Sequence, residues 1–141
     1  MPIHSQVVVL GGGPGGYAAA FMAADLGLKV ALVEAAPQLG GTCLLRGCIP
    51  SKALLHVARV VAEAHEVVEW GLSFDKPKLD IDKMRARKDK VIGTLSGGLA
   101  QLAKRRKVQV INARGVFVDS QTLQLEGGDP ATYENERLTF D

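Results

Sequence analysis

The sequence predicts an α/β fold in which a parallel sheet is followed by an antiparallel β-meander. Within the first 34 residues, a β-branched run, a glycine-rich turn, a helical segment and a second apolar run follow one another. A long helix-forming region then leads to a third apolar run, and alternating apolar residues near the C-terminal end indicate hairpin strands. Strands that alternate with helices form parallel sheets with right-handed crossovers, whereas strands joined by short turns pair in antiparallel fashion.

Length and composition limit the possible functions. The chain has 141 residues, which corresponds to one domain or to a piece of a larger protein. Its 47% hydrophobic content is sufficient for a packed core, while a net charge of +2 and only 5% aromatic residues do not favour nucleic acid or a membrane surface as a partner. Neither a secretion signal nor an apolar run of about 18 residues is present. We therefore expect a cytoplasmic protein without nucleic-acid or membrane partners.

The N-terminal segment predicts a βαβ unit. Residues 6–10 form a continuous β-branched run that is typical of a buried strand, and residues 11–16 form a turn. Residues 17–26 predict a short helix that ends at a glycine, and residues 29–33 predict the second strand. Glu34 follows that strand directly.

Two helical regions occupy the middle of the chain. Helical spacing extends from about residue 42 to residue 68, and residues 80–107 predict one long helix after a connector at 71–78. Within the long helix, the Gly97-Gly98 pair predicts a kink or a close contact. The apolar faces are expected to contain Leu54, Val57, Val61, Ala64 and Val68 in the first region, and Ile81, Met84, Val91, Leu95, Leu99 and Leu102 in the second.

The C-terminal part predicts four strands. Residues 108–111 form a third buried run, and residues 116–118 and 122–125 read as an antiparallel pair around a turn at 119–121. Residues 136–140 begin another strand. No closing element follows, so we expect the fold to be incomplete at its C-terminal end.

A G-x-G-x-x-G pattern indicates a dinucleotide site. Gly11 allows the tight turn, Gly13 allows a diphosphate to approach the backbone, and Gly16 allows the helix to pack on the strand. The helix N-terminus offers free N–H groups to the phosphates. Glu34, 23 residues after Gly11, can accept both ribose hydroxyls of an adenosine. The alternative is a glycine-rich turn that binds no ligand.

Cys43 and Cys48 form a C-x4-C pair. In an ideal helix these residues lie about 140° apart, so a disulfide requires a bend, which Gly47 and Pro50 permit. A strained, easily reduced disulfide suits redox catalysis, and Lys52 can stabilise a thiolate. Two buried thiols, half of a zinc site and a structural disulfide remain as alternatives. A disulfide beside a dinucleotide favours a flavin, because a flavin can accept a hydride and exchange electrons with thiols.

Two segments carry a resemblance to a known family. They read GGGPGGYAAA at residues 11–20 and GGTCLLRGCIPSKALLH at residues 40–56. Together with Glu34, these motifs resemble the class I pyridine nucleotide–disulfide oxidoreductases, especially the members that oxidise dihydrolipoamide. Ser51 favours those members over the glutathione reductases, which usually have a second lysine there.

The resemblance implies a Rossmann-like FAD-binding domain and a reaction. Residues 1–141 would be an N-terminal fragment of that domain, and the NAD-binding and dimer-interface domains would be absent from this chain. The parent would be a homodimer that oxidises protein-bound dihydrolipoamide to lipoamide on the lipoyl domains of 2-oxoacid dehydrogenase complexes. Electrons would pass through a Cys43–Cys48 disulfide and bound FAD to NAD+, and the fragment alone would be inactive. A mercuric or glutathione reductase-like enzyme, or a non-enzymatic dinucleotide-binding thiol switch, is the alternative.

The resemblance also assigns roles to residues. Cys43 would exchange with dihydrolipoamide, and Cys48 would lie next to the flavin, which would shield it and leave Cys43 the more accessible thiol of the full-length parent. Apart from the resemblance, the nearby helix start and Lys52 predict a lower pKa for Cys48 than for Cys43. Lys52 would lie close to the flavin ring, and Gly115 would present its backbone to the adenine. No metal is expected. The full set of cofactor-binding residues is Gly11, Gly13, Pro14, Gly15, Gly16, Glu34, Ala35, Leu39, Gly40, Gly41, Thr42, Cys43, Cys48, Lys52 and Gly115.

Two departures from the family pattern concern this site. Leu45-Arg46 stands between the thiols where the family usually has Asn-Val, which places a longer, charged side chain there. Ala113 replaces a common glycine next to Gly115.

Overall fold

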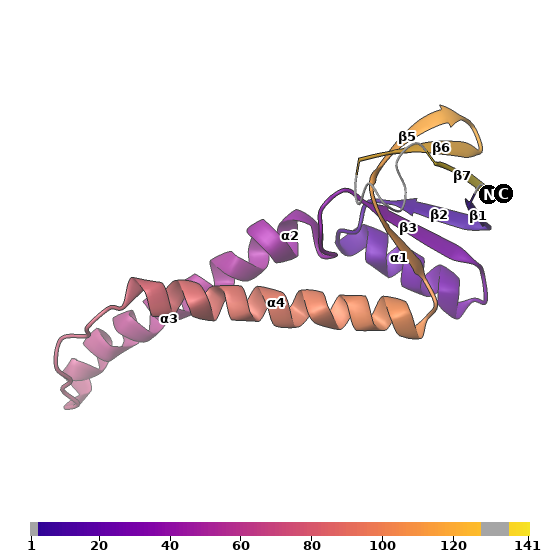
Figure 1. The fold of residues 1–141 in the computed structure, drawn as a ribbon. Coiled ribbons are helices and arrows are strands. Elements are labelled where there is room, and N and C mark those ends of the chain that lie inside the picture. The colour runs from indigo at the N-terminus through magenta and orange to yellow at the C-terminus, as the bar shows by residue number, and fades with distance from the viewer. Residues whose placement is uncertain (1–2, 128–135) are drawn as a thin grey trace.

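The computed structural model describes residues 3–127 and 136–141 as three layers with a projecting helical arm (Figure 1). A parallel sheet lies between two helices on one side and an antiparallel sheet on the other. The elements in chain order are β1 (Ile3–Ser5), β2 (Val7–Leu10), α1 (Pro14–Asp25), β3 (Val30–Glu34), α2 (Gly41–Arg46), α3 (Cys48–Glu66), the 3-10 helix η1 (Val67–Trp70), α4 (Ile81–Arg105), β4 (Gln109–Asn112), β5 (Arg114–Asp119), β6 (Thr122–Glu126) and β7 (Arg137–Phe140).

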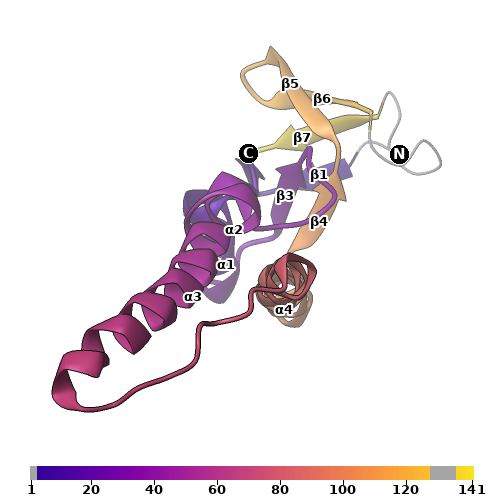
Figure 2. The same ribbon diagram turned by 90° about the vertical axis from the view of Figure 1, so that its left-hand side faces the viewer.

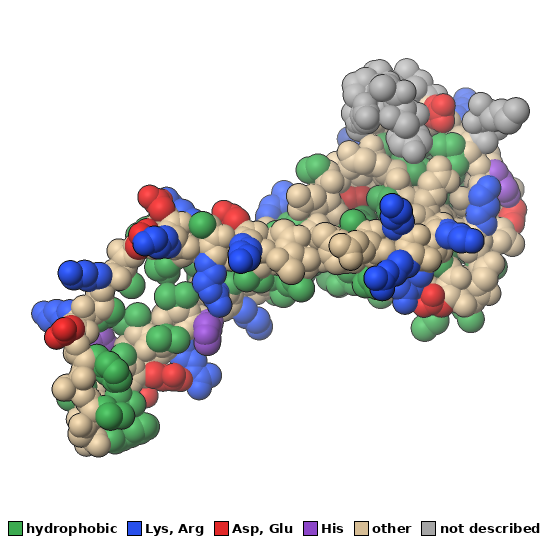
Figure 3. Space-filling view, turned by 60° about the horizontal axis from the view of Figure 1, so that its bottom comes forward, with side chains coloured by type: hydrophobic (Ala, Val, Ile, Leu, Met, Phe, Trp, Pro, Cys, Tyr) green, Lys and Arg blue, Asp and Glu red, His purple; other side chains and the backbone are tan. Residues whose placement is uncertain are grey.

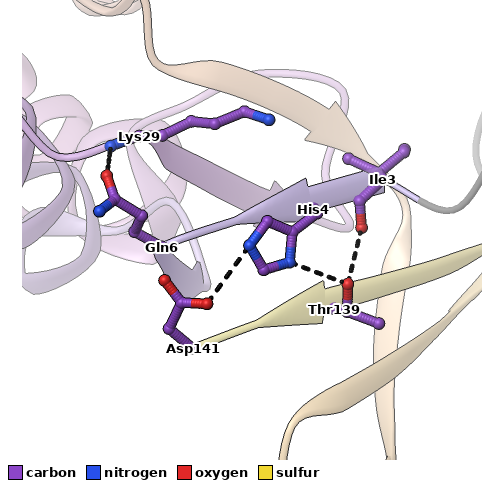
Figure 4. A network of polar contacts seen from close by, with 6 residues as sticks. All are labelled: Ile3, His4, Gln6, Lys29, Thr139 and Asp141. Atoms are coloured by element: carbon purple, nitrogen blue, oxygen red, sulfur yellow. Dashed lines mark hydrogen bonds and ion pairs between the residues drawn. The ribbon is translucent and has the colours of Figure 1, made fainter.

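The two sheets confirm the predicted fold class. The parallel sheet has the order β2-β3-β4, and the second sheet has the order β1-β7-β6-β5 with antiparallel pairing of β5, β6 and β7. Strand β1, which pairs in parallel with β7, was not predicted from the sequence. His4 on β1 lies beside this junction, where its ring contacts the Thr139 hydroxyl at 3.1 Å and the Asp141 carboxylate at 3.3 Å (Figure 4).

Strand β3 is buried on both faces because it lies between the helices and the second sheet. Val30 and Leu32 pack with α1 and α4, whereas Ala31 and Val33 pack toward the antiparallel sheet, as expected from the alternation of side chains along a strand. The two sheets enclose a cluster of Ala31, Val33, Ile111, Ala113, Leu123, Leu125 and Leu138.

The predicted helical region at 42–68 is divided into two helices. The chain bends at Gly47, where φ is −123° and ψ is −106°, and α3 starts at Cys48. Pro50 lies in the first turn of α3, where its missing N–H costs no helical hydrogen bond. In contrast, α4 runs through Gly97 and Gly98 without interruption, and a Cβ at either glycine would meet nothing within 4 Å. The predicted kink or close contact at these glycines was therefore wrong.

Helix α3 and the first half of α4 form an arm that leaves the sheets (Figures 1 and 2). The predicted apolar faces were only partly correct, because neither helix is fully covered by its neighbour. Val57, Val61 and Ala64 on α3 are half-buried. Met84, Val91 and Leu99 on α4 are half-buried as well. Leu54, Val68, Ile81, Leu95 and Leu102 are instead exposed. Figure 3 shows hydrophobic side chains gathered at the end of the arm, where Trp70, Leu72, Phe74 and Leu79 are exposed.

Candidate functional site

The glycine turn joins β2 to α1 as predicted, and the helix starts three residues earlier, with Pro14 in its first turn. Gly11 has a φ of 102°, a conformation that favours glycine, and its N–H donates to the Val33 carbonyl at 2.8 Å. A Cβ at Gly16 would overlap the carbonyl oxygen of Gly11, so helix and turn approach as closely as glycine allows. Gly13 is the N-cap and has no capping side chain, so the first N–H groups of α1, which include that of Gly15, face outward from the turn.

The Glu34 carboxylate is held by two backbone N–H groups. Its Oε2 accepts from Gly12 at 2.6 Å, and its Oε1 accepts from Ala36 at 2.7 Å. A carboxylate has about four acceptor positions, so two remain for other donors. The carboxylate is therefore oriented beside the glycine turn and retains the capacity to accept two hydroxyl groups, as ribose binding requires. Gly12, which the sequence motif did not single out, contributes this contact.

A second glycine pair brings the loop after β3 against the turn. The Gly40 N–H donates to the Gly12 carbonyl at 2.9 Å, and Gly40 and Gly41 have φ angles of 133° and 61°. A Cβ on Gly41 would lie 2.6 Å from the Cα of Gly13. The start of α2, including Thr42, therefore lies directly beside the start of α1.

Two polar side chains that sequence reasoning missed hold the same loop. The Asn112 side-chain amide donates to the carbonyls of Glu34 and Ala36, and the buried Ser96 hydroxyl donates to the Leu39 carbonyl. These contacts join the loop to the end of β4 and to α4. The loop, α4 and β4 line a solvent-open pocket of about 520 Å³.

The two cysteines lie on either side of the Gly47 bend. Both are free thiols, and Cys43 is half-buried while Cys48 is exposed. The expectation that Cys43 is the more accessible thiol concerns the flavin-bound parent, in which the flavin would shield Cys48, and it stays a prediction. Cys48 is the first residue of α3, and Lys52 lies one turn later on the same helix. Both residues are exposed.

The pKa of the Cys43 thiol is raised above its ordinary value. The largest cause is its hydrogen bond with the Cys48 side chain, followed by partial burial and by the negative charge of a Cys48 thiolate. The N–H of Cys48 and the ammonium of Lys52 act in the opposite direction. The thiols therefore lie close enough for Cys48 to raise the pKa of Cys43, which favours a redox pair over two separate buried thiols. The positive charge of Lys52 favours a thiolate at Cys43, and its expected effect on a Cys48 thiolate stays a prediction.

The remaining predicted residues line the same region or its borders. Ala35 and Arg46 line an open hollow of about 610 Å³ beside the loop after β3. Arg46, the charged residue between the two thiols, thus lines this hollow. The cation whose charge lowers the pKa of Cys43 is Lys52. A Cβ at Gly115 would lie 2.8 Å from Leu10, so packing between the sheets also requires a glycine there.

Among residues 3–127 and 136–141, no three His, Cys, Asp or Glu side chains are grouped closely enough to hold a metal ion. In the same part of the chain, no helix has the length and apolar character needed to cross a membrane.

The arrangement of these residues fits a dinucleotide. Uncapped helical N–H groups suit a diphosphate, and Glu34 suits a ribose. The thiol pair follows on the adjacent helices, and this combination defines the class of disulfide oxidoreductases that use a bound dinucleotide. Comparison with known families agrees: the chain matches the family described as pyridine nucleotide-disulphide oxidoreductase over residues 5–140, and it belongs to that family.

Within the family, the chain is similar to dihydrolipoyl dehydrogenases. It is 53% identical over 139 residues to the enzyme of Vibrio cholerae, which covers 99% of this chain and 28% of that protein. It is 52% identical over 132 residues to the enzyme of Haemophilus influenzae, covering 92% of this chain and 28% of that protein. A leghemoglobin reductase of Vigna unguiculata is 43% identical over 124 residues, covering 87% of this chain and 24% of that protein. The chain thus spans less than a third of the length of these relatives.

Proposed function

We propose that this chain carries the FAD-binding and disulfide centre of an enzyme that oxidises protein-bound dihydrolipoamide to lipoamide and passes the electrons to NAD+. The single observation that carries the proposal is that Cys43 and Cys48 lie on either side of the Gly47 bend, on helices that start beside the glycine cradle. The 53% identity to a dihydrolipoyl dehydrogenase supports the choice of substrate.

The residues that would hold FAD belong to three neighbouring segments. Gly11, Gly13 and the first N–H groups of α1 would receive the diphosphate, and Glu34 would accept the ribose hydroxyls. Gly40 and Gly41 would let the cofactor pass close to the backbone toward α2. When bound, FAD supplies a two-electron acceptor that connects a dithiol to NAD+.

The thiol pair would undergo exchange with the substrate. In the oxidised state, a thiolate of dihydrolipoamide attacks the sulfur of Cys43 in the Cys43–Cys48 disulfide, and Cys48 leaves as a thiolate. The second thiol of the substrate then attacks its own sulfur in the mixed disulfide, which releases lipoamide and leaves Cys43 reduced. Two electrons and two protons leave the substrate, and the Lys52 ammonium stabilises the negative charge on the thiol pair.

The setting of this reaction follows from the same proposal. Residues 1–141 would form the N-terminal part of the FAD-binding domain, and NAD-binding and dimer-interface domains of a homodimeric enzyme would lie outside these residues. The partners would be lipoyl domains of 2-oxoacid dehydrogenase complexes. A reducing compartment such as the cytoplasm suits a thiol pair that cycles between disulfide and dithiol instead of staying a permanent structural disulfide.

Turnover measurements test the substrate. The complete natural protein that carries these residues should oxidise dihydrolipoamide with NAD+ as the acceptor. A second candidate is reduction of a different substrate, because one relative is a leghemoglobin reductase and is 43% identical to this chain. Absence of dihydrolipoamide oxidation, together with efficient turnover of another disulfide, mercuric ion or a haem protein, would contradict the proposal.

A further inference from the structure

The loop between β3 and α2 is tied to the rest of the fold by side chains from two distant elements. Asn112 at the end of β4 donates to the Glu34 carbonyl at 3.0 Å and to the Ala36 carbonyl at 2.5 Å. Ser96 on α4 is 5% exposed, and its hydroxyl donates to the Leu39 carbonyl at 2.9 Å. Three carbonyls along residues 34–39 are therefore fixed from outside the loop.

The Asn112 contacts determine where the Glu34 carboxylate lies. A side-chain amide has two N–H bonds, and Asn112 uses its amide for two carbonyls that are two residues apart. This fixes the turn at residues 34–36, in which the Ala36 N–H points back to the Glu34 carboxylate. Without the amide, the turn at residues 34–36 would lose the two contacts that hold its carbonyls. The Ala36 N–H could then turn away, and the carboxylate would lose one of its two backbone donors.

The Ser96 contact acts on the other end of the same loop. Leu39 is 5% exposed and touches the glycine turn, since a Cβ at Gly12 would lie 2.7 Å from its side chain. Gly40 follows immediately and bonds to Gly12. Loss of the Ser96 hydroxyl leaves a buried carbonyl without its partner, which costs more than a hydrogen bond at the surface.

We infer that Asn112 and Ser96 are positioning residues, which set the shape of loop 35–40 and thereby hold the Glu34 carboxylate where it meets a bound ribose. They act through the loop and need not contact the cofactor themselves. The inference rests on the proposed function, because it assumes that Glu34 accepts ribose hydroxyls. Sequence motifs do not reveal it, since both residues lie more than 50 positions from the loop that they hold.

Nucleotide selectivity separates this role from a general effect on folding. The flavin-free form of the complete natural protein is titrated with ADP and with 2′-deoxy-ADP. The unmodified protein should bind ADP about tenfold more tightly or better, because a hydrogen bond to a carboxylate is stronger than an ordinary one. In Asn112→Asp, which keeps the side-chain volume but removes both donors, this preference should fall to about twofold or less. Ser96→Ala should reduce it in the same direction and serves as the milder variant.

One control lies on α4 beside Ser96, and the other is a side-chain amide in the second sheet. Thr94→Ala removes a hydroxyl of α4 that donates to the Lys90 carbonyl within the helix, and Gln124→Ala removes an amide that donates to the Glu136 carbonyl in the second sheet. Both controls should keep the preference for ADP. An unchanged preference in Asn112→Asp and Ser96→Ala, with weaker binding of both nucleotides, would overturn the inference alone. Equal binding of the two nucleotides by the unmodified protein would overturn it together with the assigned role of Glu34.

Discussion

At the scale of single residues, the glycine turn requires that particular positions carry no Cβ atom. Gly15 and Gly16 are neighbours in the first turn of α1, yet their surroundings differ. A Cβ at Gly16 would overlap the Gly11 carbonyl, whereas a Cβ at Gly15 would meet nothing within 4 Å. The obstacle at Gly16 is backbone, so it cannot move aside like the end of a flexible side chain.

Alanine substitutions at these two glycines should therefore have opposite effects. Gly16→Ala should lower the free energy of unfolding by about 1–3 kcal/mol or more, because the turn must shift to relieve the overlap. Gly15→Ala should be neutral or stabilising by up to about 1 kcal/mol, because alanine favours the helix. Urea denaturation of the flavin-free protein measures both. Equal destabilisation would show that the turn does not have the geometry described.

The thiols should differ in their reaction with an alkylating reagent. In the reduced, flavin-free protein, exposed Cys48 should be labelled before half-buried Cys43. Because the pKa of Cys43 is raised, its hydrogen-bonded thiol persists at neutral pH, and its labelling should accelerate only when the pH rises above the ordinary thiol range near 8.5. Mass spectrometry of iodoacetamide adducts between pH 7 and about 10 tests this. Faster labelling of Cys43 at neutral pH would contradict it.

Lys52 provides a control for the electrostatic part of this argument. Its ammonium lowers the pKa of Cys43, so Lys52→Ala should raise that pKa further and slow the labelling of Cys43 at a fixed alkaline pH. His56→Ala, one turn later on α3, should leave the rate unchanged.

Sequence motifs revealed only some of the residues at the site. Fixed spacings in the sequence revealed Gly11, Gly16 and Glu34, because the glycine turn and the ribose site require them. The C-x4-C spacing revealed the cysteine pair. Gly12, Asn112 and Ser96 act through contacts between distant segments, and a single sequence carries no signal for such pairs. The exposure of the two thiols also depends on the bend at Gly47, which motif spacing does not determine.

At the scale of elements, α4 has a clear start and an uncovered surface. Asp80 precedes the helix, and its Oδ1 accepts from the Lys83 N–H at 3.0 Å, as an N-cap does. The helical spacing predicted a start at residue 80, one residue before the observed start at Ile81. It did not predict which face would be covered, because that depends on how α3 lies against α4.

Removal of the cap should weaken the fold at this helix. Asp80→Ala should lower the free energy of unfolding by about 1 kcal/mol, whereas Asp80→Asn should retain most of the stability, since asparagine also caps helices. Asp82→Ala is the matched control, because its exposed carboxylate contacts Arg85 only at 3.6 Å. Thermal unfolding should show a lower Tm for Asp80→Ala than for Asp82→Ala. A larger loss in the control would exclude Asp80 as the cap.

Helix boundaries were harder to predict than helix positions. The apolar spacing is continuous across residues 42–68, so it predicts one helix. Gly47 breaks this helix because its backbone leaves the helical region, and the break brings Cys43 and Cys48 together. The same break therefore explains why residues that are five apart in sequence can interact.

At the scale of the whole molecule, the arrangement of the layers determines where the dinucleotide site lies. The parallel sheet ends at Leu10, Glu34 and Asn112, and all three strand ends lie at the same edge. Continuous apolar runs separated by helical segments predicted the parallel sheet, and alternating apolar residues around a short turn predicted the antiparallel strands. The pairing of β1 with β7 joins segments more than 130 residues apart, and three residues are too few to carry a pattern.

The central claim is that the thiol pair lies at the flavin, with Cys48 on the flavin side. The test is the absorbance spectrum of the complete natural protein, purified with FAD and reduced by two electrons. A thiolate beside the flavin gives a long-wavelength band, so Cys48→Ser should abolish the band and Cys43→Ser should preserve it. The opposite pair of spectra would reverse the two roles, and no change in either variant would contradict the claim that the cysteines lie at the flavin.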